Sequence, residues 1–171
     1  MAEYTSRSFD LLTLGQLLLR LSPPDNDRLS RGDTFVKQVG GAELNVAVGA
    51  SLLGLRTGVI SKLPSHDIGS FMKGKIRSFG VSDDFFMYDD SPSARVGIYY
   101  YENGAYPRKP KVIYDRMNSS FFSLNIDEIP KEVYTASKCF HTTGITLALS
   151  PQIRETTIEM IKRFKEAGTL V

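Results

Sequence analysis

The sequence has few features of a disulfide-stabilised, membrane-spanning or strongly charged protein. Its single cysteine, Cys139, cannot form a disulfide within the chain, and a lone thiol fits a reducing compartment. The formal net charge of +2 is too small to favour nucleic acid or a membrane surface as a partner. The leucine run from Leu17 to Leu19 is interrupted by Arg20, and no secretory signal is recognisable. These absences predict a cytoplasmic protein.

Several common catalytic motifs are also missing. The sequence contains no G-x-x-x-x-G-K-[ST] phosphate loop, no clustered metal ligands and no Ser/His/Asp arrangement. His66 precedes an expected helix that Ser65 or Asp67 would cap, and His141 at the end of an apolar strand is typical of a core residue. What is present is an ordinary globular composition, 42% hydrophobic and 23% charged, in 171 residues, a length typical of one domain.

Apolar periodicity predicts alternating strands and helices rather than repeats. Helix 43–53 has Leu44, Val48 and Leu52 on one face. The tyrosine-rich runs 95–102 and 111–115 are joined by a Gly/Pro loop, as in a hairpin. The other predicted strands are 9–14, 16–22, 34–39, 57–62 and 137–141, and the other predicted helices are 66–79, 129–136 and 150–167, the last ended by Gly168. The pattern predicts a parallel α/β sheet with helices on both faces and a small β excursion near residues 16–38 and 95–116.

The most informative segment is a glycine pair, Gly40 and Gly41, that leads directly into the apolar helix. Glycine can adopt positive φ and lets a ligand approach the main chain, while the N–H groups of a first helical turn can donate to hydroxyls or an anion. Asn45 adds a side-chain donor and acceptor that suit a polyol. A glycine turn before an ordinary core helix would fit the local pattern equally well.

A second group of candidate binding residues lies in the predicted hairpin. Strand alternation places Tyr114 and Arg116 on the same side, so both can face one ligand together with Tyr99. A guanidinium binds a carboxylate through two parallel hydrogen bonds. The alternative is that the tyrosines are ordinary sheet aromatics and that Arg116 is a surface charge.

Several patches in a fixed order resemble the ribokinase-like (PfkB) carbohydrate kinases, and within that family the 2-keto-3-deoxygluconate kinases. The resemblance covers the chain from about Ser8 onward. It implies a ribokinase-like three-layer sandwich with a mainly parallel sheet and a β lid from about 16–38 and 95–116, so that residues 1–171 would be the N-terminal portion of a sugar-kinase domain. The patches that carry the resemblance are residues 10–24, 40–45, 53–64, 67–69, 79–81, 95–100, 112–116 and 140–146.

The resemblance also implies an activity, namely ATP-dependent phosphorylation of 2-keto-3-deoxygluconate at its terminal hydroxyl. ATP and Mg²⁺ would bind mostly to a C-terminal part, and the lid would form a homo-oligomer. Fructose or another sugar is an alternative substrate, and a non-catalytic nucleotide-binding or sugar-binding module is an alternative class. The residues implied to line the sugar pocket are Gly41, Ala42, Glu43, Leu44, Asn45, Tyr99, Tyr114 and Arg116.

Two departures from the family pattern affect these expectations. The family places its catalytic aspartate in a G-x-G-D turn, and this tetrapeptide does not occur here. We therefore expect the 171-residue chain to lack kinase activity by itself and, with an exposed sheet edge, to be poorly soluble. Gln16 stands where many family members have an acidic residue, and an amide can bond a hydroxyl but cannot hold a charge.

Overall fold

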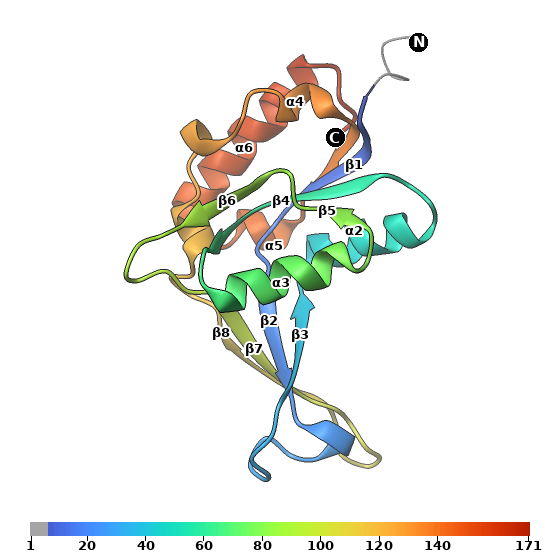
Figure 1. Cartoon of the computed structure of the whole chain (residues 1–171), viewed down its shortest axis with the longest axis vertical. Coiled ribbons are helices and arrows are strands. Elements are labelled where there is room, and N and C mark those ends of the chain that lie inside the picture. Colours follow the sequence, from blue (N-terminus) through green and yellow to red (C-terminus); the bar gives the residue numbers. More distant parts are fainter. Residues whose placement is uncertain (1–6) are drawn as a thin grey trace.

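The computed structural model describes residues 7–171, which form two sheets and the helices that cover the larger one (Figure 1). The larger sheet has the order β5-β4-β1-β9, with β6 also paired to β4, and every pairing in it is parallel. Such strands are buried on both faces and need helical connections, which explains their short apolar sequences. The strands are β1 (Phe9–Leu14), β4 (Thr57–Pro64), β5 (Val81–Ser82), β6 (Phe86–Asp89) and β9 (Ser137–His141).

Alternating residues of this sheet face two separate hydrophobic clusters. Leu12 and Leu14 of β1 pack with helices α4 (Val133–Ala136) and α6 (Pro151–Glu166). Val59 of β4 faces the opposite way, toward α2 (Ala42–Leu52) and α3 (Asp67–Arg77). The two-residue period of a strand accounts for this division. The result is a helix–sheet–helix sandwich, which confirms the predicted α/β class.

A second sheet extends away from this body (Figure 1). Its order is β3-β2-β7-β8, with β2 parallel to β7 and the other two pairings antiparallel. It is built from the two segments predicted to form the β excursion, near residues 16–38 and 95–116, and we refer to it as the lid sheet. Its strands are β2 (Leu18–Ser22), β3 (Val36–Gly40), β7 (Gly97–Glu102) and β8 (Lys111–Asp115).

The buried face of α2 differs from the predicted one. Glu43, Leu44 and Ala47 are buried, whereas Leu52 is 74% exposed. This helix carries apolar residues on nearly all sides, so periodicity does not single out one stripe.

Local details at two helix ends also correct or extend the predictions. The His66 ring caps α3, with Nδ1 accepting a hydrogen bond from the Ile68 N–H at 3.2 Å, so the predicted cap at Ser65 or Asp67 was wrong. A short helix α5 (Gly144–Leu147) follows β9 and is not among the predicted helices. Gly168 has a φ of +73°, as expected of the residue that ends α6.

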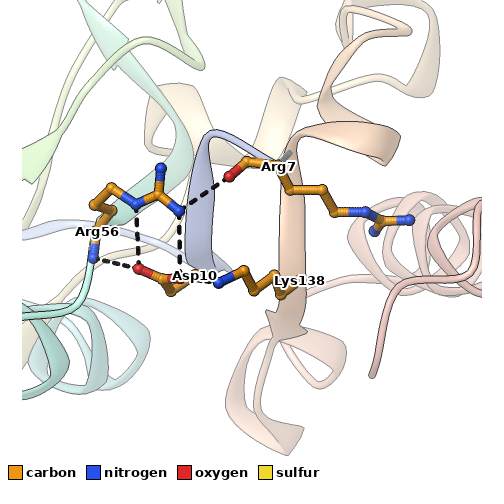
Figure 2. A network of polar contacts seen from close by, with 4 residues as sticks. All are labelled: Arg7, Asp10, Arg56 and Lys138. Atoms are coloured by element: carbon orange, nitrogen blue, oxygen red, sulfur yellow. Dashed lines mark hydrogen bonds and ion pairs between the residues drawn. The ribbon is translucent and has the colours of Figure 1, made fainter. Parts of the chain in front are cut away.

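Charged side chains join three neighbouring strands at the amino ends of the main sheet (Figure 2). Asp10 of β1 accepts a hydrogen bond from Lys138 Nζ of β9 at 2.7 Å and from the backbone N–H of Arg56, just before β4, at 2.9 Å. The Arg56 side chain also donates to the Arg7 carbonyl at 3.0 Å. These contacts, led by the Lys138 hydrogen bond, hold the pKa of Asp10 well below its usual range.

No helix within residues 7–171 combines the length and the apolar character needed to cross a bilayer.

Candidate functional site

A pocket of about 240 Å³ lies where the carboxyl ends of the main strands meet the lid sheet. One wall comes from the first turn of α2, through Gly41, Ala42, Glu43 and Asn45. Carboxyl ends of parallel strands are the usual place for ligand sites in α/β folds. Four of the five residues predicted for this wall line the pocket.

The opposite wall comes from the lid sheet. Tyr99 of β7 and Tyr114 of β8 are direct cross-strand partners, and their ring centroids are 6.0 Å apart. Arg116 follows β8 and has its guanidinium carbon 5.7 Å from the centroid of the Tyr114 ring. Gln16, Leu18 and Ile145 complete the lining. The structure thus brings seven of the eight predicted residues into one pocket.

Leu44 is the exception. Its side chain is only 3% exposed and packs in the core with Ala47 and Val59, and it does not line the pocket. Each residue of a helix is rotated by about 100° from the previous one, so consecutive residues of α2 cannot all face the same cavity.

The glycine pair permits close approach between protein segments. Gly41 is the N-cap of α2 with a φ of +153°, and a Cβ there would lie 2.9 Å from the carbonyl oxygen of Gln16. A Cβ at Gly40 would lie 2.6 Å from the Tyr99 hydroxyl oxygen. The two glycines therefore let the lid tyrosine and the chain after β1 come against the start of α2, which closes the pocket.

Glu43 is a buried carboxylate that fixes the turn after β9. Its Oε1 accepts hydrogen bonds from the Thr143 hydroxyl at 2.6 Å, the Thr143 N–H at 3.2 Å and the Thr146 hydroxyl at 2.7 Å. The side chain is 2% exposed, and its other oxygen lies against Gly15, where a Cβ would collide with it. Glu43 thus acts mainly as a scaffold for the pocket wall.

Sequence reasoning missed the part played by Gln16. This side chain is 3% exposed and forms three hydrogen bonds. Its amide nitrogen donates to the Arg116 carbonyl at 3.0 Å and to the Ser119 hydroxyl at 2.7 Å, and its amide oxygen accepts from Arg116 Nε at 2.8 Å. In the sequence, Gln16 is recognisable only as a polar residue directly after a predicted strand and a glycine. The partners of Gln16, Arg116 and Ser119, lie about a hundred positions away in the chain, so the sequence pattern does not reveal them.

Burial sets the electrostatics of the lid wall. It lowers the pKa of Arg116, with smaller opposing effects from Tyr114 and Glu43, and it raises the pKa of Tyr99. A half-buried guanidinium that forms no ion pair among the described residues is partly desolvated, so an anionic ligand would offset some of the desolvation cost. The pocket therefore combines hydroxyl and N–H donors with one cation, a set that suits a small hydroxylated acid.

The described residues give no comparable support for a nucleotide or metal site. No group of three or more His, Cys, Asp or Glu side chains within residues 7–171 could hold a metal ion. A cleft of about 550 Å³ beside α6 is lined by residues such as Asn125, Glu155 and Lys162, and no glycine turn is among its lining residues. We assign no residue of this chain to ATP or Mg²⁺.

Comparison with known proteins identifies the class. The family model described as pfkB family carbohydrate kinase matches residues 8–171. The chain belongs to this family.

Individual relatives agree with the assignment. A 2-dehydro-3-deoxygalactonokinase of Haloferax volcanii is 39% identical over 160 residues, which is 94% of this chain and 49% of that protein. A 2-dehydro-3-deoxygluconokinase of Bacillus subtilis is 29% identical over 95% of this chain and 49% of that protein. The solved structure of a 2-dehydro-3-deoxygluconokinase from Thermotoga maritima superimposes with a TM-score of 0.88 at 34% identity, covering 94% of this chain and 49% of that one. The chain spans about half the length of the curated relatives it matches.

Proposed function

We propose that this chain forms the sugar-acid-binding part of an ATP-dependent kinase that phosphorylates 2-keto-3-deoxygluconate at its terminal hydroxyl. The observation that carries the proposal is the pocket itself, in which the first turn of α2 faces Arg116 across a small polar cavity. Backbone N–H groups and Asn45 suit the hydroxyls of a sugar, and the guanidinium suits its carboxylate. The lid would exclude water that could otherwise accept the phosphoryl group.

A second sugar acid has specific support. The Haloferax volcanii relative carries the name 2-dehydro-3-deoxygalactonokinase and is 39% identical. Because the galactonate and gluconate forms share the carboxylate, Arg116 would serve either one. Fructose, which has no carboxylate, is the contrasting candidate.

Binding to the 171-residue chain distinguishes these candidates. We expect titration calorimetry to detect 2-keto-3-deoxygluconate binding, and Arg116→Ala to weaken it at least tenfold while leaving any fructose binding unchanged. Arg31→Ala, which removes an exposed arginine of the loop before β3, is the matched control. Fructose binding that is equal to or tighter than acid binding in the unsubstituted chain would contradict a sugar-acid kinase.

The chemical step requires residues outside those described. In phosphoryl transfer, catalysis rests on positioning and electrostatic stabilisation. The proposed kinase would take its base, its ATP and its Mg²⁺ from a part that this chain does not contain, so the chain alone should transfer no phosphoryl group. ATP-dependent phosphorylation of 2-keto-3-deoxygluconate by purified residues 1–171 would refute that assignment.

The lid sheet is also the proposed contact of a cytoplasmic homo-oligomer. Phe35, Val36, Val112 and Ile113 are large apolar residues of the lid that are 42% to 45% exposed. Light scattering after size exclusion tests this, with a dimer expected for the unsubstituted chain and a monomer for Ile113→Lys.

A further inference from the structure

We infer that Gln16 is a positioning residue that gives this pocket its preference for anionic ligands, because it aims the Arg116 guanidinium without neutralising its charge. The inference rests on the proposed function, since it concerns the same pocket and the same arginine. It assigns a role to a side chain that is not among the predicted ligand contacts.

The amide at position 16 satisfies two hydrogen-bonding groups of Arg116. The Arg116 carbonyl can only accept a hydrogen bond, and Arg116 Nε can only donate one. Gln16 meets both demands at once, donating to the carbonyl at 3.0 Å and accepting from Nε at 2.8 Å. Its second amide hydrogen is directed at the Ser119 hydroxyl at 2.7 Å. With the side chain 3% exposed, water does not compete for these three bonds.

Arg116 keeps its charge available for a ligand. Only Nε is bonded to the protein, and within the described chain the two terminal nitrogens form no hydrogen bond and the guanidinium forms no ion pair. Glu43, the carboxylate that acts on Arg116 through space, already accepts three hydrogen bonds from Thr143 and Thr146. The terminal nitrogens can therefore bind a carboxylate through two bonds.

Glutamate at position 16 would reverse this arrangement. It has the size of glutamine, but it would place a carboxylate oxygen against the Arg116 carbonyl, where two acceptors face each other. Its charge would also form an ion pair with the guanidinium and lower the attraction for an external anion. Methionine at this position keeps the length and the neutrality but removes all three hydrogen bonds.

The test compares two probes of nearly equal size, the anion 2-keto-3-deoxygluconate and its neutral C1 amide, by titration calorimetry on the 171-residue chain. We expect the unsubstituted chain to prefer the acid, and Gln16→Glu to reduce the ratio of the two affinities at least tenfold. Gln38→Glu adds the same charge at an exposed position of β3 and should change the ratio less than twofold. A Gln16→Glu chain that folds by circular dichroism and keeps the full preference would overturn the inference and leave the proposed function intact.

A second measurement does not depend on sugar binding. The Arg116 Nε–H resonance, assigned in a ¹H–¹⁵N spectrum by its loss in Arg116→Lys, should exchange slowly with water and should become fast in Gln16→Met. Exchange in the unsubstituted chain as fast as that of exposed Arg31 would show that Gln16 does not hold the arginine. If neither probe binds, the proposed function fails, and this resonance alone decides whether Gln16 positions Arg116.

Discussion

The carboxylate of Glu43 accepts a hydrogen bond from the Thr143 hydroxyl at 2.6 Å, although the two residues are 100 positions apart. The bond links the first turn of α2 to the turn that follows β9. Both turns contribute lining residues to the pocket between α2 and the lid sheet, so the carboxylate fixes the relative position of the two turns.

Glu43→Ala should lower the free energy of unfolding by about 2–3 kcal/mol, because two hydroxyls and one backbone N–H lose their acceptor in a buried place. Chemical denaturation of the 171-residue chain measures this. Glu155→Ala removes an exposed carboxylate and should change stability by less than about 0.5 kcal/mol. Equal losses in the two variants would mean that the Glu43 contacts contribute nothing specific.

Gly41→Ala should destabilise the chain by about 1–3 kcal/mol, because an alanine at a φ of +153° is strained and its Cβ would lie 2.9 Å from the Gln16 carbonyl. Gly49→Ala, in the same helix, meets nothing within 4 Å and should stabilise by about 0.5–1 kcal/mol. Thermal unfolding of the pair checks the contrast. Two variants that shift the midpoint in the same direction would argue against a required glycine at position 41.

Much of the fold was predictable because it depends on local pattern. The predicted strand 137–141 forms β9 over those same residues, and the tyrosine-rich runs pair as the expected hairpin. Strand β6 was not predicted, since Phe86–Asp89 is short and lies in a polar stretch. The site was predictable only where glycines and alternating side chains mark it. The contact between Gln16 and Arg116 depends on tertiary structure, which sequence periodicity does not encode.

Tyr99→Phe should weaken binding of 2-keto-3-deoxygluconate by roughly threefold to tenfold, the value of one lost hydrogen bond, without lowering stability. The ring would remain paired with Tyr114. Tyr101→Phe is the control, because Tyr101 lies in β7 like Tyr99 but is outside the pocket lining, with its ring against Arg20 of β2. Calorimetry on both variants decides whether the Tyr99 hydroxyl contacts the ligand, and identical affinities would contradict that contact.

Asp10→Asn should lower stability near neutral pH by on the order of 1 kcal/mol, a modest value because Arg56 and Lys138 are partly exposed to solvent. The folded-state pKa of Asp10 lies below the ordinary value of 3.8, so its carboxylate stabilises the fold above that pH. The benefit is lost as the pH falls below 3.8. Denaturation curves of the two chains should therefore converge in acid, and a difference that stays constant with pH would contradict the ion pairs.

The most direct test of the account is an NMR titration of the 171-residue chain with 2-keto-3-deoxygluconate. We expect the backbone amides of residues 41–45 and of Tyr99, Tyr114 and Arg116 to shift together with one affinity, because both walls would contact one ligand. Shifts confined to a single wall, or located instead at the cleft beside α6, would contradict a shared sugar-acid pocket.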